Sequence, residues 1–260
     1  MLRGWRRLYR LSVELGTRDL LRNGLSREGL IRVVIPLDPS RYLELPWAER
    51  ALGARPRERV LDLASPKLLA VALARAGVQV VSVDALPSEV ELWRRLAPDA
   101  RFEVADGRAL PYADASFDRG YSLSVLEHIG GDGDERALAE IARVVKPGGR
   151  IVLTMPYAGE YREDWRDRPV YSPEGGPADR EAERYFFERW YDETRLDRLL
   201  ARAPVVERSR EVVRLEPNWN RLYNRHFPRL LPLGPFFGLI GREVAGPGGD
   251  VARLVLERAG

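Results

Sequence analysis

The chain of 260 residues contains no cysteine, only two histidines, and only two lysines among its 42 basic side chains. Without cysteine, it can form neither a disulfide bond nor a thiolate metal site. Glutamine and asparagine are scarce too, and a shortage of thermolabile residues is typical of a thermophile. Long apolar runs are missing, and the basic N-terminal segment spaces its apolar residues helically, unlike a secretory signal. We therefore expect a cytoplasmic, soluble protein.

The charge is balanced and dispersed. The 42 basic and 39 acidic side chains leave a net charge of +3 and are spread along the whole chain. No concentrated basic arm is present, so binding to nucleic acid is disfavoured. A hydrophobic content of 45% is enough to bury a core, and the length fits one domain with additions.

From residue 58 onward, short apolar runs alternate with helical patterns. Strands are expected at RVLDL, VQVVSVD, RFEVAD, FDRGYSL and GRIVLTMP, and later at VVERSREVVRL and DVARLVLER. Helices are expected at PKLLAVALARAG, LPSEVELWRRLA, DERALAEIARVVKPGG and RYFFERWYDETRLDRLLARA. Strands that alternate with helices in this way predict an α/β fold whose parallel sheet is covered on both faces.

Other segments depart from this rhythm. Residues 1–57 precede the first strand and show helical patterns at 4–22 and 41–52, which predicts an N-terminal helical cap on a main domain of residues 58–260. Insertions are expected at about 158–182 and 216–247. The first is long and polar, as is typical of a lid or binding loop. Within the second, the apolar stretch 224–242 predicts either a helix packed on the core or a lipid-facing wall.

Polar residues follow several of the predicted strands, where an open parallel sheet binds its ligand. They are Asp62 to Lys67, Asp84, Asp106 to Arg108, and Ser122 to His128. Asp84 lies 22 residues after Asp62, close to the spacing of about 20 at which a carboxylate meets ribose hydroxyls in dinucleotide folds. A carboxylate there would repel a 2′-phosphate, so NADP is disfavoured. The alternative for each aspartate is a turn or helix N-cap.

Four stretches together resemble a known family. VLDLASPK, VVSVDAL, ADGRALPYADASFDRGYSLSVLEHI and VVKPGGRIVLTMPY are similar to successive motifs of class I S-adenosylmethionine-dependent methyltransferases, in the small-molecule group related to ubiquinone and menaquinone methyltransferases. The resemblance covers about residues 58–157. It implies a Rossmann-like three-layer sandwich with a mostly parallel seven-stranded sheet whose last strand is antiparallel, and S-adenosylmethionine as the cofactor.

The resemblance also implies roles for individual residues. Asp84, with Ala85 beside it, would hold the ribose hydroxyls, and Asp106 the adenine amino group. The backbone of Gly107 and Arg108 would lie alongside the adenine. Ser122 and Leu123 would line the methionine end. The turn from Asp62 through Ala64 and Ser65 to Lys67 would lie beneath the methionyl group.

That turn contains no glycine, although glycines usually provide positive φ and close backbone approach there. We expect Ser65 to act as the helix N-cap and Pro66 to occupy the first helical position. Lys67 either attracts the cofactor carboxylate or is a solvated first-turn lysine. Cofactor binding is therefore expected to persist with altered contacts.

Two residues are candidates for contact with the methyl acceptor. His128 follows the fourth strand and is either a general base or a packing residue, and Tyr157 follows the fifth strand. Ser124 replaces the first glutamate of the E-V-L-E-H pattern that related enzymes associate with a metal, so no metal is expected. The predicted reaction is O-methylation of a small-molecule, glycan or lipid-linked acceptor, and peripheral membrane contact stays open. The alternative is a non-catalytic methyltransferase-like binding subunit.

Overall fold

The computed structural model describes residues 4–38, 40–170, 180–181, 184–216, 242–246 and 249–260. In this part of the chain, one eight-stranded sheet has the order β10-β9-β11-β5-β4-β1-β2-β3. Its strands are β1 (Arg59–Leu63), β2 (Gln79–Asp84), β3 (Arg101–Val104), β4 (Phe117–Leu123), β5 (Val145–Pro156), β9 (Val205–Glu216), β10 (Arg242–Ala245) and β11 (Val251–Arg258).

The strand directions match the predicted architecture. The first five strands of the chain pair in parallel, with β1 at the centre between β2 and β4. The last strand, β11, runs antiparallel to both β5 and β9. The prediction of a mostly parallel Rossmann-like sheet with an antiparallel last strand is therefore confirmed. The short strand β10 adds an antiparallel edge beyond β9.

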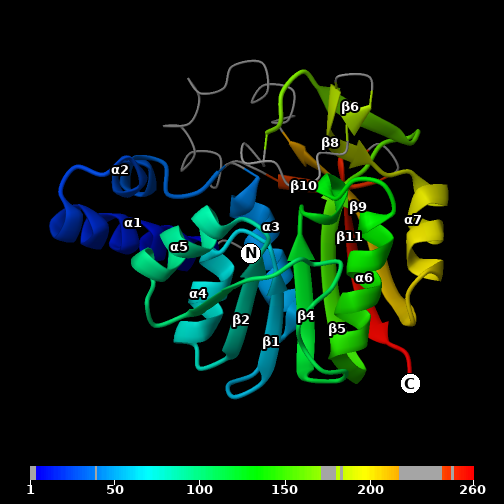
Figure 1. Ribbon diagram of the computed structural model, residues 1–260, viewed down its shortest axis with the longest axis horizontal. Coiled ribbons are helices and arrows are strands. Elements are labelled where there is room, and N and C mark those ends of the chain that lie inside the picture. The colour runs from blue at the N-terminus through cyan, green and yellow to red at the C-terminus, as the bar shows by residue number, and fades with distance from the viewer. Residues whose placement is uncertain (1–3, 39, 171–179, 182–183, 217–241, 247–248) are drawn as a thin grey trace.

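Helices cover both faces of this sheet and create two apolar cores (Figure 1). The helices after the first strands are α4 (Leu68–Arg75), α5 (Pro87–Leu96), α6 (Gly133–Val144) and α7 (Glu193–Ala201). Buried side chains of α4 and α5 pack on one face, and those of α6 and α7 pack on the other. The ligand-binding edge of such a sheet is left to the loops after the strands.

The N-terminal region is helical, as predicted. It contains α1 (Gly4–Asn23), α2 (Arg27–Val34) and α3 (Arg41–Leu52). Buried apolar residues of α1 and α3 belong to the same core as α4 and α5. α1 and α3 are therefore held by the sheet domain, and in Figure 1 α1 and α2 lie at the left while α3 lies near the centre.

The segment after β5 differs from the prediction in two places. Residues 184–190, expected to begin a helix, form strand β8 (Arg184–Trp190), and the helix begins only at α7. β8 pairs with β6 (Arg162–Arg166) and β7 (Arg180–Glu181), so part of the expected polar loop at 158–182 belongs to a small sheet. Pairing of aromatic residues across strands outweighed the local helical pattern, as at Trp165 and Phe186, whose rings meet edge to face.

Two further expectations are limited by what the structure describes. Most of the stretch 224–242 lies outside the described residues, so the choice between a packed helix and a lipid-facing wall stays open. Among the described helices, none is both long and apolar enough to cross a bilayer.

Candidate active site

The turn after β1 adopts a glycine-like backbone without glycine. Ala64 has φ of 53°, in the left-handed region that glycine normally occupies. The expectations for its neighbours were wrong: α4 begins only at Leu68, and the Ser65 hydroxyl does not cap it. Instead Ser65 Oγ accepts a hydrogen bond from the backbone N–H of Leu123 at 2.9 Å. The serine therefore ties the turn to the end of β4.

Lys67 is buried at this turn and contacts the carboxylate at the end of the next strand. Its Nζ lies 2.9 Å from Oδ2 of Asp84 and donates to the Ser65 carbonyl at 3.0 Å. The lysine side chain is only 4% exposed and that of Asp84 only 12%. Lys67 is therefore not a solvated first-turn lysine. It is a buried cation beside Asp84, the carboxylate predicted to bind the ribose. Oδ1 of Asp84 accepts from the Leu86 N–H at 3.0 Å, and Ala85 between them is exposed.

Asp62 is a buried support of the same turn. Its carboxylate accepts from the Ser65 N–H at 3.1 Å and from the Ser82 hydroxyl at 2.7 Å. Burial raises the pKa of Asp62, although the Lys67 charge and these hydrogen bonds oppose the shift. With no exposed surface, this carboxylate can position the turn but cannot contact a ligand directly.

Asp106 follows β3 and is open to solvent. The guanidinium of Arg108 forms an ion pair with Asp106, in which Nη2 lies 2.9 Å from Oδ2. The backbone N–H of Arg108 donates a hydrogen bond of 2.9 Å to Oδ1 of Asp106. These hydrogen bonds lower the pKa of Asp106, so it stays ionised near neutral pH. Gly107 packs so closely on Leu63 that a Cβ would lie 2.8 Å from its Cδ1. The loop after β3 thus sits directly against β1.

Ser122 and Leu123 are buried at the end of β4. The Ser122 hydroxyl donates to the Leu63 carbonyl at 3.1 Å, and both residues have almost no exposed surface. The Ser122 side chain and the backbone N–H of Leu123 join β4 to β1 and its turn. Neither side chain is exposed enough to contact a ligand.

His128 follows β4 in a short 3-10 helix, η1 (Leu126–His128). Its Nδ1 lies 2.7 Å from the Phe187 carbonyl on β8, and its ring packs on the Phe187 ring. Because a carbonyl only accepts, Nδ1 carries the proton in the neutral ring and Nε2 is the basic nitrogen. Burial lowers the pKa of His128, and the Arg41 charge acts in the same direction. The ring is therefore neutral at pH 7.

A buried carboxylate from the N-terminal helices lies at the ends of β4 and β5, which form one corner of the sheet edge. This carboxylate was not predicted from the sequence. Glu44 of α3 accepts from Ser124 Oγ at 2.9 Å and from Thr154 Oγ1 at 2.5 Å, and it pairs with Arg41. Burial would raise the pKa of Glu44, but the Arg41 charge and these hydrogen bonds outweigh it and lower the pKa. Ser124 has φ of 53°. The carboxylate thus holds a strained residue at the end of β4.

Glu127, next to His128, is a second buried acid. Its side chain is 3% exposed, its Oε1 lies 4.0 Å from His128 Nε2, and within the described part of the chain its Oε2 has no hydrogen-bond partner. Burial and the negative charges of Glu188 and Glu44 raise its pKa well above the ordinary value. Glu127 is therefore held as the neutral acid beside the imidazole.

Tyr157 follows β5 as predicted, but it turns toward α7. Its hydroxyl lies 3.5 Å from Glu193 at the start of that helix, and its backbone N–H donates to Asp250 at 2.9 Å. Burial and the Glu193 charge raise the pKa of Tyr157. The phenol therefore stays protonated near neutral pH and can donate a hydrogen bond.

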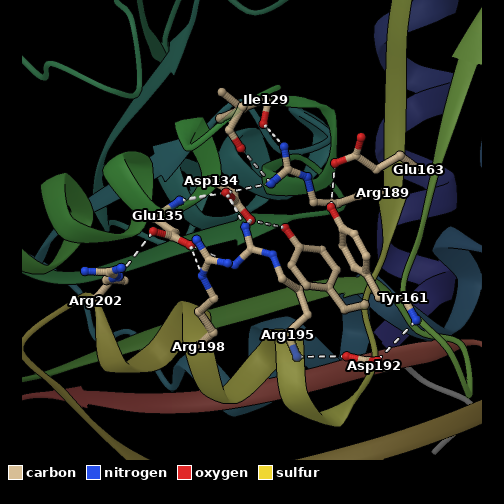
Figure 2. Close-up of polar contacts among 12 residues, drawn as sticks. Ile129, Asp134, Glu135, Tyr161, Glu163, Arg189, Asp192, Arg195, Arg198 and Arg202 are labelled. Carbon is tan, nitrogen blue, oxygen red and sulfur yellow. Dashed lines mark hydrogen bonds and ion pairs between the residues drawn. The ribbon is translucent and has the colours of Figure 1, made fainter.

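A network of ion pairs borders this corner (Figure 2). Fully buried Asp134 of α6 lies 2.8 Å from both Arg189 and Arg195, and the Tyr191 hydroxyl donates to it at 2.9 Å. A cavity of about 400 Å³ beside the network is lined by Tyr161, Arg189, Arg195 and other polar residues. The arginines pair with acids of this chain, so the network holds β8 and α7 against α6. No local sequence pattern could predict this network, because its members come from three separate segments.

The sheet domain is similar in sequence to a known protein family. The model of the family described as "Methyltransferase domain" matches residues 61–153, which include the ends of β1 to β4. The resemblance to class I methyltransferases is thereby confirmed. The methyltransferase domain supplies Asp84, Asp106 and His128, whereas Glu44 comes from outside it.

Among curated proteins, the chain is similar to a demethylmenaquinone methyltransferase of Beutenbergia cavernae, with 42% identity over 113 residues. The matched region is 42% of this chain and 46% of that protein. The chain thus spans about half the length of the curated relatives it matches.

Solved structures show the same fold at low identity. A 1,6-didemethyltoxoflavin-N1-methyltransferase of Burkholderia thailandensis, with S-adenosylhomocysteine bound, has a TM-score of 0.55 at 18% identity, over 86% of this chain and 80% of that chain. The [4+2]-cyclase SpnF has a TM-score of 0.52 at 18% identity, over 84% and 80%. At such identities the likeness concerns the fold alone.

Proposed function

We propose that this protein is an S-adenosylmethionine-dependent methyltransferase that acts on an oxygen of a small-molecule or lipid-linked acceptor. The observation that carries the proposal is the placement of Asp84 and Asp106 at the ends of the neighbouring strands β2 and β3 of a methyltransferase domain. Several curated relatives are named demethylmenaquinone methyltransferases, and this supports an amphiphilic acceptor within the proposed class.

The residues present fit the nucleoside part of the cofactor. An ionised carboxylate offers about four lone-pair sites. Asp84 uses sites for Lys67 and the Leu86 N–H, which leaves acceptor capacity for ribose hydroxyls. Asp106 is half-exposed and ionised, so it can accept from an adenine amino group. The left-handed Ala64 keeps the turn in the shape that glycine would give it.

The chemistry divides between the cofactor and this chain. The bound cofactor would supply a sulfonium methyl group for in-line displacement, in which alignment and exclusion of water are the main tasks of the protein. A hydroxyl acceptor must also lose its proton, and we assign that proton to Nε2 of His128. The Phe187 carbonyl fixes the ring orientation for this role, and the lowered pKa keeps it neutral. The protonated Tyr157 is the second residue proposed to contact the acceptor.

One observation favours a second candidate, a non-catalytic binding subunit. The carboxylate proposed for the ribose is already paired with a buried lysine, and the turn beneath it contains no glycine. In a domain without catalytic activity, the Lys67–Asp84 ion pair could have a purely structural role. The fold itself is compatible with several functions.

Two measurements separate the candidates. Calorimetric titration with S-adenosylhomocysteine tests the donor site, and incubation with radiolabelled S-adenosylmethionine and cell extract, followed by mass spectrometry, tests transfer. The enzyme should show both saturable binding and a labelled low-molecular-weight product. Binding without any product would favour the non-catalytic subunit. No heat at millimolar ligand would reject the cofactor site itself.

A further inference from the structure

Apolar side chains gather at the free end of the N-terminal helices. Of the eight large hydrophobic residues that are exposed in the described part of the chain, five lie between residues 21 and 34. They are Leu21 (83% exposed), Leu25 (89%), Leu30 (42%), Ile31 (38%) and Val34 (54%). Isolated exposed hydrophobics are common, but a group on one short segment indicates an interaction surface.

The orientation of α2 places its apolar stripe away from the core. Leu30, Ile31 and Val34 follow Arg27 at spacings of three, four and seven residues, so they share one helical face. The opposite side holds the buried Gly29, which packs so closely on Leu20 of α1 that a Cβ there would lie 2.8 Å from Cγ. Arg32 is also turned inward, with its guanidinium 4.2 Å from the centroid of the Trp93 ring. The fold thus turns a half-buried arginine toward the core and leaves the aliphatic residues outside.

Two arginines flank this stripe without partners. Arg22 and Arg27 are exposed, and neither has a hydrogen bond or ion pair within the residues that the structure describes. The neighbouring Arg18, by contrast, is 2.7 Å from Glu14. Asp19, the acidic residue closest in sequence to Arg22, is buried and paired with Arg95. The end of the α1–α2 pair therefore presents apolar side chains beside two exposed arginines, with Glu28 as the acidic residue next to Arg27.

We infer that this surface docks on an anionic phospholipid bilayer. It is called the α2 tip here and consists of Leu21, Arg22, Leu25, Arg27, Leu30, Ile31 and Val34. An interfacial helix buries its apolar face at the headgroup boundary while arginines meet anionic lipid, and the α2 tip offers both. A second copy of the chain is a poorer fit, because stable interfaces use about 20 to 30 residues a side and the tip has seven.

The arrangement in the molecule agrees with this docking mode. Figure 1 shows α1 and α2 at the left of the view, with α2 above α1 and the sheet to the right of both. Docking by the α2 tip would hold the domain at a membrane surface without inserting any of the described helices across it. The inference stands independently of the proposed reaction, because it needs no bound cofactor.

The test is co-sedimentation of the full chain with vesicles of phosphatidylcholine, with and without phosphatidylglycerol. The wild-type protein should sediment with the anionic vesicles and far less with the neutral ones. The variant Leu21→Ser/Leu25→Ser should lower the partition coefficient about tenfold or more, because two exposed leucines no longer enter the headgroup region. Val206→Ser is the matched control, since Val206 is 43% exposed on β9 and lies outside the tip.

A charge variant separates the two contributions. Arg22→Glu/Arg27→Glu should lower binding to anionic vesicles about tenfold or more and leave binding to neutral vesicles unchanged. Raising the salt from about 0.1 M to about 0.5 M should weaken wild-type binding and have a smaller effect on this variant. All the changed residues are exposed, so circular dichroism and melting temperatures should match the wild type.

Several results would overturn the inference. They are no sedimentation of the wild-type protein with anionic vesicles, full binding by the leucine variant, or an equal loss in Val206→Ser. A dimer in light scattering that the leucine substitutions dissociate, together with absent vesicle binding, would assign the tip to a second copy instead.

Discussion

The two corners of the sheet edge are built in different ways. At the ends of β1, β2 and β3, the polar groups come from neighbouring segments of one domain, where buried Lys67 pairs with Asp84 and Ser82 donates to Asp62. At the ends of β4 and β5, the polar groups come from α3, β4, η1, β5 and β8, and Glu44 contacts Thr154 across 110 residues of sequence. The first corner is a local structure, and the second exists only when distant elements pack together.

The largest expected effect concerns Glu44, which connects the N-terminal helices to the second corner. Glu44→Ala should lower the free energy of unfolding by about 3 to 5 kcal/mol, because it leaves the Arg41 charge without its partner in a buried site. Urea unfolding provides the measurement. The control Glu14→Ala removes a half-exposed ion pair with Arg75 and should cost under about 1 kcal/mol. Similar losses for the two variants would mean that Glu44 is not the link between the corners.

His128→Gln tests the chemistry of the second corner. Turnover should fall about a hundredfold or more, the usual contribution of a general base, while affinity for S-adenosylhomocysteine stays constant. Because burial lowers the pKa of His128, the base is lost as the pH falls through a value below the ordinary one of about 6.5. The wild-type pH–rate profile should therefore have an acid limb below about 6.5 that the variant lacks.

A stable variant with normal turnover and an unchanged profile would leave the acceptor proton to another group. Loss of melting temperature with normal turnover per folded molecule would assign His128 to packing against Phe187.

Asp84→Ala tests the first corner. Affinity for S-adenosylhomocysteine should fall by about 1.5 to 3 kcal/mol, because hydrogen bonds to a charged acceptor are lost. Asp84→Asn keeps the volume of the side chain and guards against misfolding around the unpaired Lys67. Asp106→Ala should cost less, since that carboxylate is 47% exposed. An unchanged dissociation constant in both Asp84 variants would contradict the ribose assignment.

The smallest expected effect concerns Lys67. Lys67→Met makes the site more negative by one charge, so affinity for the cationic sulfonium should rise about threefold or more relative to the neutral thioether. The ratio of the two dissociation constants is the measurement, because both ligands share the ribose and adenine contacts. Lys146→Met is the matched control, since Lys146 is exposed and pairs with Asp118 at 2.6 Å. Equal weakening of both ligands would instead indicate that Lys67 contacts the methionyl carboxylate.

The sequence itself determined the scaffold and one corner. Alternating apolar runs and helical patterns placed β1 to β5 and the helices between them, since burial on both faces of a parallel sheet leaves that periodicity in the residues. Asp62, Asp84 and Asp106 could be predicted because they lie at or just beyond the carboxyl ends of those strands. The Lys67–Asp84 contact could not be predicted from the sequence, because the residues around a turn lysine are the same whether its side chain is solvated or buried.

Only the tertiary structure decided the rest. Glu44 lies on a helix where a surface glutamate would be expected, and only the packing of α3 against β4 and β5 buries it. Residues 184–190 became a strand because β6 and β7 provided partners across the intervening chain. The outward stripe of α2 has a similar cause, since Gly29 allows close approach to α1 and so fixes which face is left exposed. Local pattern specifies which elements form, but burial and pairing between distant segments specify which side chains meet.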